Sequence, residues 1–356
     1  MTETAMADPA ESAPLQARLV ALRDAEPNIR ARDAAEKLGV SEGELLACRC
    51  GAGVQRLQGP WGDLIQALPG LGRVMALTRN DHAVHEKKGV FGNISIFGDR
   101  MGLVLNRDID LRIFLGHWHF GFAVAEAAGE STRHSLQFFD CDGTAVHKIH
   151  LLEDSNRAGY DDLVARFLTP DQSPAMAVTP VPAGPDDRPD PAIDTVVLRD
   201  RWLGLRDVHD FHAMLDEVGT GRMQALRLVG RDLAWPVDVK SFRIAVTAAA
   251  AQEIPVMVFV GSPGVVQIHT GPVVTLRDVG PWFNILDPHF NLHLREDRIA
   301  GAWVVRKPTR DGIVTSLEIY DGDGAQIAWL FGERGEGKGE RHDWRALVES
   351  LEGADA

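Results

Sequence analysis

The stretch SLQFFDCDG at residues 135–143 returns as SLEIYDGDG at residues 316–324, an offset of 181 residues. Each copy has the apolar run of a strand followed by an Asp or Gly turn signal. At the same offset DLRI (110–113) matches NLHL (291–294), and FAV (122–124) matches WVV (303–305). An offset that stays constant across strand and turn signals predicts a duplication of one unit rather than a solenoid.

Each unit is expected to place helices before a sheet. Apolar residues recur at helical spacing from Leu15 to Cys50, Gly39 is a candidate C-cap, and Ser41 has Glu44 at capping-box spacing. Short apolar runs separated by turn residues then predict antiparallel strands between residues 74 and 151, one of them over Val90 to Phe97, and a helix over 160–168. The predicted class is α+β, with two structurally repeated halves, each made of helices plus a large antiparallel sheet.

Seven prolines between residues 169 and 191 interrupt every periodic pattern and predict a linker. The expected organisation is a disordered tail over 1–12, an N-terminal repeat over 13–168, a Pro-rich linker over 169–195 and a C-terminal repeat over 196–356.

Composition limits the classes of partner. The 356-residue chain is 45% apolar and 25% charged, as in globular proteins, and its net charge of -14 argues against general binding to nucleic acid or to an anionic membrane. No apolar run reaches the roughly 18 residues that span a bilayer. The N-terminus lacks the pattern of a signal peptide, and the three cysteines form no disulfide framework. These features predict a cytoplasmic protein.

Two short patterns resemble metal-ligand pairs. His117 and His119 are two residues apart, a spacing that places both on one face of a strand, but the sequence indicates no third ligand. Cys48 and Cys50 have no second pair nearby. A half-exposed strand and two ordinary thiols are the simpler interpretations.

The stretch LRDVHDFH at residues 205–212 opens a predicted amphipathic helix with Asp207 as its N-cap. His209 would then lie in the first turn, beside the apolar stripe that begins at Val208, and His212 nearer the core. The positive end of the helix dipole favours neutral imidazole with a free lone pair, which suits an axial iron ligand. Two surface or half-buried histidines are the simpler interpretation.

With these residues in view, the chain resembles the cytoplasmic haemin-utilisation family, the HemS/HmuS/ChuS/PhuS-type "hemin-degrading factor" proteins. The resemblance covers both halves and is carried by four segments together: TRNDHAVHE (78–86), DLRIFL (110–115), SLQFFD (135–140) and RDVHDF (206–211). It implies two repeated α+β halves that hold one haem b (iron protoporphyrin IX) in a cleft between a helix of the C-terminal half and a sheet.

The resemblance also implies a set of site residues. The proximal iron ligand falls on His209, and an arginine that approaches the other face of the iron falls on Arg112. Further residues near the porphyrin edge fall on Arg222, Lys307, Phe331 and Arg334. His212 is a candidate alternative ligand or a core histidine, and each cation could instead be an ordinary surface charge. A haem site needs apolar walls, an axial donor and cations at its rim.

Three functions remain open. The first is a haem carrier that accepts haem from an importer and passes it to a haem oxygenase. The second is a haem oxygenase-like enzyme that cleaves the porphyrin with external electrons, and the third is a haem-responsive interaction protein. The chain has no C-x-x-C-H attachment motif, which favours reversible binding. It also lacks a P-loop, a G-x-S-x-G and a Rossmann fingerprint.

Overall fold

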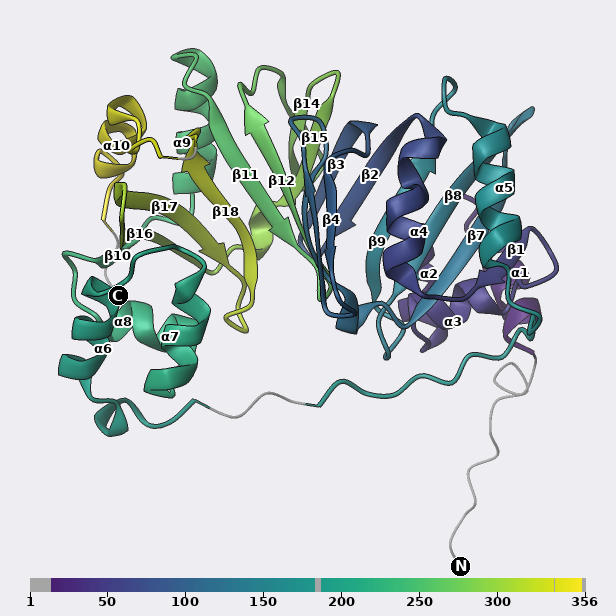
Figure 1. Ribbon diagram of the computed structural model, residues 1–356, viewed down its shortest axis with the longest axis horizontal. Coiled ribbons are helices and arrows are strands. Elements are labelled where there is room, and N and C mark those ends of the chain that lie inside the picture. The colour runs from purple at the N-terminus through teal and green to yellow at the C-terminus, as the bar shows by residue number, and fades with distance from the viewer. Residues whose placement is uncertain (1–13, 183–186, 336, 354–356) are drawn as a thin grey trace, which may run out of the picture.

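The computed structural model of the protein describes residues 14–182, 187–335 and 337–353. The disordered tail expected over residues 1–12 lies outside these ranges. Residues 169–182, in the first part of the expected linker, form neither helix nor strand and cross from one half of the molecule to the other (Figure 1). Among the described residues, no helix has the length and apolarity that crossing a bilayer requires.

The N-terminal half contributes five helices and nine strands to the described structure. They are α1 (Leu15–Ala25), α2 (Ala31–Leu38), α3 (Glu42–Ala47), β1 (Val54–Leu57), α4 (Trp61–Ala67), β2 (Arg73–Arg79), β3 (Ala83–Val90), β4 (Ile94–Phe97), β5 (Met101–Leu105), β6 (Asp110–Phe114), β7 (Phe120–Ala128), β8 (Ser131–Phe139), β9 (Ala145–Leu151) and α5 (Arg157–Phe167).

The C-terminal half contributes the same numbers of each. They are α6 (Thr195–Leu203), α7 (Asp210–Val218), α8 (Arg222–Leu228), β10 (Ala234–Val237), α9 (Ser241–Ala251), β11 (Val256–Gly261), β12 (Val265–Gly271), β13 (Leu276–Val279), β14 (Trp282–Leu286), β15 (Phe290–Arg295), β16 (Gly301–Thr309), β17 (Gly312–Tyr320), β18 (Gln326–Gly332) and α10 (His342–Glu349). Strand for strand the two lists agree at offsets of 180 to 183 residues, so the predicted duplication and α+β class are confirmed.

The two halves exchange strands. The first antiparallel sheet has the order β1-β7-β8-β9-β2-β3-β15-β14-β13, and the second has the order β10-β16-β17-β18-β11-β12-β6-β5-β4. Each nine-stranded sheet therefore contains six strands of one half and three of the other. The joins are the pairs β3–β15 and β12–β6. The pattern of the sequence did not predict this exchange.

Local signals explain several element ends. Ser41 and Glu44 form the predicted capping box at the start of α3, and Gly39 ends α2 in the left-handed conformation with a φ of 67°. Gly219 ends α7 in the same way, with a φ of 71°. The single strand predicted over Val90 to Phe97 is wrong, because the chain turns between β3 and β4, where Asn93 has a φ of 51°.

The cores leave one face of the second sheet partly open. Its inner face packs against α9, α10 and strands of the first sheet. On its outer face, α6, α7 and α8 cover the end formed by β16 and β17, where Trp303, Val305 and Tyr320 are buried. Figure 1 shows these three helices gathered at one end of the molecule. The outer face of β11, β12, β6 and β5 is not covered by these helices, and many of its side chains are half-buried.

Candidate functional site

The turn that carries His209 lies directly before α7. The prediction that Asp207 caps the helix is wrong, because α7 begins at Asp210 and His209 occupies the N-cap position without a side-chain cap. Instead the Asp207 carboxylate accepts hydrogen bonds from the backbone N–H of His209 at 2.9 Å and from Nδ1 of its ring at 2.5 Å. The side chain of His209 is 75% exposed.

This contact assigns the two ring nitrogens of His209 different roles. A carboxylate on Nδ1 holds that nitrogen as the donor and leaves the Nε2 lone pair free, the arrangement seen for most metal-binding histidines. The His209 hydrogen bonds, with a smaller contribution from the charge of Arg334, hold the pKa of Asp207 below its ordinary value, so the carboxylate is ionised at neutral pH. Arg334 is therefore close to the His209 turn.

His212 lies one turn further along α7. Its side chain is exposed, so the expectation that it lies nearer the core is wrong. The apolar stripe of α7 consists instead of Phe211, Met214 and Leu215, which are buried against Trp202 and the outer face of the second sheet. His209 and His212 are thus both at the solvent side of a firmly packed helix.

Beneath α7 lies a group of polar and charged side chains, here called the ionic cluster, made of the half-buried Arg222 and the buried Lys307, Glu318 and Tyr320. Arg222 donates to both oxygens of Glu318 at 2.8 Å, Lys307 Nζ donates to Oε1 at 2.9 Å, and the Tyr320 hydroxyl donates to Oε2 at 2.5 Å. Two cations share one carboxylate, so the cluster has a net charge of +1 when Lys307 is protonated.

The surroundings shift the pKa values within the cluster. Burial alone would raise the pKa of Glu318, but Arg222 and Lys307 lower it well below its ordinary value. Burial lowers the pKa of Lys307 to about 8, and the attraction of Glu318 offsets only part of that effect. Phe211 covers both cations, with Lys307 Nζ 4.3 Å and the Arg222 guanidinium carbon 4.9 Å from its ring centre.

Next to the cluster the outer face of the second sheet is apolar. Directly paired residues of antiparallel strands share a face, and the pairing of Trp329 with Phe259 and of Phe331 with Met257 places four large side chains together. All four are only half-buried. The ring centres of Phe259 and Phe331 are 5.0 Å apart. This surface continues across β12, β6, β5 and β4. We call it the open face.

Arg112 of β6 belongs to the open face. It pairs directly with Val266 of β12 on one side and with Leu103 of β5 on the other. Its Nη1 donates to the neighbouring Asp110, whose pKa is raised by burial and partly restored by that ion pair. Arg112 is half-buried, so it is a fixed cation within an apolar surface rather than a fully solvated one.

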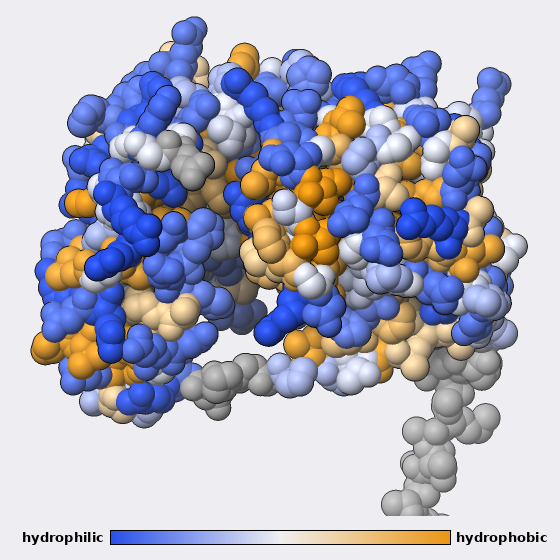
Figure 2. All heavy atoms as spheres, in the orientation of Figure 1, coloured by the Kyte–Doolittle hydropathy of each residue, from blue (hydrophilic) through white to orange (hydrophobic). Residues whose placement is uncertain are grey.

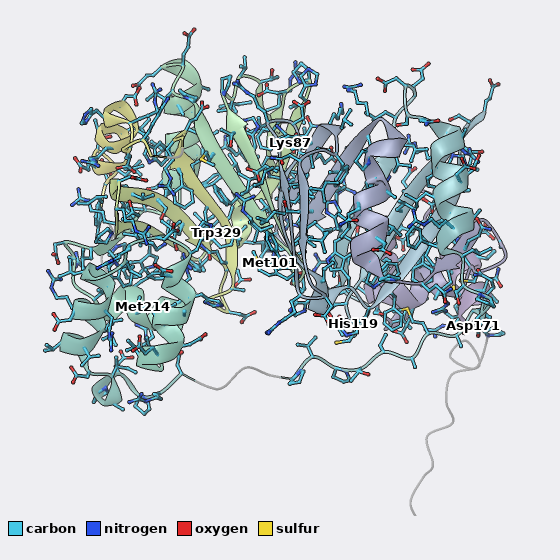
Figure 3. The ribbon with its side chains drawn as sticks, in the orientation of Figure 1. Lys87, Met101, His119, Asp171, Met214 and Trp329 are labelled. Carbon is cyan, nitrogen blue, oxygen red and sulfur yellow. The ribbon has the colours of Figure 1, made fainter. Side chains whose placement is uncertain are left out.

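The far end of the open face is exposed to solvent. Phe97, Met101 and Phe114 form one row across β4, β5 and β6, and they are 56%, 36% and 40% exposed. Figure 2 shows a hollow between the α6–α8 side of the molecule and these strands, with hydrophobic residues gathered near β4. Trp329 and Met101 both border the hollow (Figure 3). Apolar surface left uncovered in this way is typical of a ligand or partner site.

The equivalent place in the N-terminal half is different. At the repeat offsets the ionic cluster residues Arg222, Lys307 and Glu318 correspond to Glu42, Glu126 and Gln137. There Glu42 pairs with Lys148, and Glu126 pairs with Arg49 at 2.5 Å. Ion pairs of opposite arrangement thus stand where the C-terminal half has its ionic cluster, so the two halves offer unlike sites.

The structure thus brings several predicted residues together. Arg222 and Lys307 share the ionic cluster, Phe331 and Arg112 lie on the open face, and Arg334 lies near the His209 turn. Two partners in the site were not predicted from the sequence: Asp207 as the partner of His209, and Glu318 as the partner of Arg222 and Lys307. The only signal for Glu318 was its place in the repeated SLEIYDGDG stretch, where an acidic residue usually indicates a solvent-exposed position.

The site suits one class of ligand. It offers a free imidazole nitrogen at its lip, a wide apolar surface and buried positive charge. A flat apolar molecule that carries anionic groups and a metal in need of an axial nitrogen would satisfy all three.

Comparisons with known proteins agree with this description. A family model for the haemin-degrading HemS.ChuX domain matches residues 39–167 and again 219–351. The hemin transport protein HmuS of Yersinia pestis is 38% identical over 341 residues, covering 96% of this chain and 98% of the relative.

Two solved structures are similar along nearly the whole chain. The holo form of PhuS, a heme-binding protein from Pseudomonas aeruginosa, superposes with a TM-score of 0.94 at 46% identity, covering 96% of this chain and 100% of that one. ChuS, described as an E. coli heme oxygenase, superposes with a TM-score of 0.87 at 37% identity, covering 95% of this chain and 99% of that one.

Proposed function

This chain belongs to the family of the haemin-degrading HemS.ChuX domain, and on that premise we propose that it binds one haem b and works as a cytoplasmic haem carrier. The carrier accepts haem after a haem importer has brought it into the cell, and it passes the haem to a haem oxygenase. The haem is cargo in this proposal, and the chain supplies the binding, the orientation and the release.

The observation that carries the proposal is the state of His209. Its Nδ1 is held by Asp207 at 2.5 Å while the side chain remains 75% exposed, which leaves Nε2 as a ready axial donor.

The other site residues complete the fit to a haem. The half-buried side chains of the open face would contact the porphyrin, and the net positive ionic cluster would attract its propionates. Arg112 would lie against the opposite face of the iron. Arg334, whose charge helps to lower the pKa of Asp207, would add positive charge at the rim.

The exposure of the ligand favours delivery over permanent retention. His209 belongs to a surface turn rather than to a closed pocket, and the chain lacks a C-x-x-C-H attachment motif. One axial bond to an exposed side chain can be exchanged for a bond from a partner protein. This property supports the carrier.

A second function has its own support, because ChuS is described as a heme oxygenase and is 37% identical to this chain. In that case His209 would remain the axial ligand and Arg112, as a fixed cation on the open face, would direct dioxygen. Electrons would have to come from outside the chain.

The test is a spectroscopic titration of the full chain with haemin, followed by ascorbate in air with catalase present. For a carrier we expect a one-to-one complex whose Soret band survives reduction. Loss of that band with formation of verdohaem or biliverdin, undiminished by catalase, would establish the enzyme instead. Failure to form a one-to-one complex would remove both functions.

A further inference from the structure

A second group of potential ligands lies on the N-terminal half, at the turn between β8 and β9. One ring nitrogen of His119, a carboxylate oxygen of Asp140 and Sγ of Cys141 all lie within 4.8 Å of one another. The two residues of the turn are more than 20 positions away from His119 in the sequence, which is why the sequence pattern showed no third ligand for the histidine pair.

The buried carboxylate organises this group. Asp140 is 1% exposed, and its Oδ1 lies 3.1 Å from Nδ1 of His119. Its Oδ2 lies 2.8 Å from Nδ1 of His117, so one carboxylate faces both histidines that precede β7. Its Oδ1 also accepts the backbone N–H of Cys141 at 2.7 Å. The carboxylate is therefore rigidly placed, while both histidines remain almost half exposed and reachable from solvent.

The repeat provides an internal comparison. At the offset of 181 residues Asp140 corresponds to Asp321, which likewise accepts backbone N–H groups of its own turn, those of Asp323 and Ala325. A turn aspartate is thus part of the shared fold. The residues equivalent to His117, His119 and Cys141 are Arg298, Ala300 and Gly322, none of which can act as a ligand. The two histidines and the thiol are additions made only in the first half.

We propose that His119, Asp140 and Cys141 bind a divalent cation of the zinc class, with His117 orienting the carboxylate and water in the fourth position. Imidazole, carboxylate and thiolate are the ligands that Zn²⁺ takes in proteins, at about 2.0–2.3 Å. Tetrahedral bonds of that length hold donor atoms about 3.3–3.8 Å apart. The present spacing needs only small side-chain rotations to reach that geometry.

The proposed cation site lies close to the segment that links the two halves. His119 directly precedes β7, at one end of the strands of the first sheet, near the segment that links the two halves (Figure 3). The backbone N–H of Thr179, in that segment, donates to the carbonyl of Cys141 at 2.8 Å. A cation at this turn would therefore brace one of the points where the linker docks, away from α7 and the ionic cluster.

The experiment uses the full chain, free of haem and treated with a chelator, and titrates it with Co²⁺ and Zn²⁺. We expect one Co²⁺ per chain, with a thiolate-to-cobalt charge-transfer band in the near ultraviolet that Zn²⁺ abolishes by displacement. Cys141→Ser should remove the band, whereas Cys50→Ser, which changes another half-buried thiol, should keep it.

Variants of the two histidines distinguish the proposed ligand, His119, from His117, which is proposed to orient the carboxylate. His119→Ala should weaken binding by more than about 100-fold and His117→Ala by about 10–100-fold, the range for outer-shell partners. His289→Ala, at an exposed histidine elsewhere, should have no effect. His209→Ala should also leave the Co²⁺ signal unchanged, so this test is independent of haem binding. Absence of stoichiometric binding, or a band that survives both Cys141→Ser and His119→Ala, would overturn the proposal.

Discussion

The carboxylate of Asp207 lies 2.5 Å from Nδ1 of His209 and also accepts the backbone N–H of the same residue. Asp207 thus holds His209 by two hydrogen bonds, one from the imidazole ring and one from the backbone N–H. The position of Nε2 is therefore set before any ligand arrives. Ligand binding then loses less conformational entropy, because the ring is already ordered in the folded protein.

Asp207→Asn tests this preorganisation. The amide cannot act as an anionic acceptor, so we expect haem affinity to fall by about 10–100-fold, as for other partners of metal-binding histidines. Haem transfer to excess apomyoglobin should become faster in proportion. Asp210→Asn, at the exposed first residue of α7, is the matched control and should transfer haem at the unchanged rate. Equal behaviour of the two variants would contradict the role of Asp207.

His209→Ala should remove the normal axial ligand. Because His212 is exposed on the same helix one turn away, we expect the variant to retain haem with a shifted Soret band and lower affinity. The double variant His209→Ala/His212→Ala should lose the specific complex. An unchanged spectrum and affinity in the single variant would mean that His209 is not the ligand.

Haem affinity should depend on pH through Lys307, whose pKa is about 8. Below that pH the ammonium is charged and the ionic cluster carries its excess positive charge. Above it the charge is lost, so affinity for an anionic ligand should decline as pH rises through about 8. Lys307→Arg keeps the charge and should remove this decline, and Lys307→Met should bind weakly at every pH. Transfer rates to apomyoglobin across this range measure the effect, and an identical decline in all three proteins would exclude Lys307 as its source.

Glu318→Gln should destabilise the fold. The substitution leaves the buried Lys307 and the half-buried Arg222 without their shared anion, and breaking a buried ion pair such as Lys307–Glu318 costs about 3–5 kcal/mol in free energy of unfolding. Lys307→Met/Glu318→Gln should recover part of that loss, because one unpaired charge is removed. Urea denaturation gives both values.

Glu349→Gln provides the comparison for a surface pair, since Glu349 bonds the partly exposed Arg306. It should cost less than about 1 kcal/mol. A similarly small loss for Glu318→Gln would show that the ionic cluster contributes little to stability.

The limits of sequence-based inference differ between fold and site. Strand and turn signals such as those at 135–143 and 316–324 recur locally, so the duplication and the class were predictable. The pairing of β12 with β6 was not, because alternation within a strand carries no information about a partner more than 150 residues away. Relationships such as Lys307 with Glu318, or His119 with Cys141, depend on which strands and turns the fold places side by side.

The exchange of strands between the halves has a consequence for how this molecule arose. A single-copy ancestor with this topology would lack three strands of its sheet and could complete it only by swapping them with an identical subunit, as an obligate symmetric dimer. Such a protein would be stable only above its dissociation constant. When the two copies are fused in one chain, the linker between them fixes their effective concentration, so stability no longer depends on the protein concentration. One subunit was then free to keep the net positive ionic cluster while the other placed the Glu42–Lys148 and Glu126–Arg49 ion pairs at the equivalent positions.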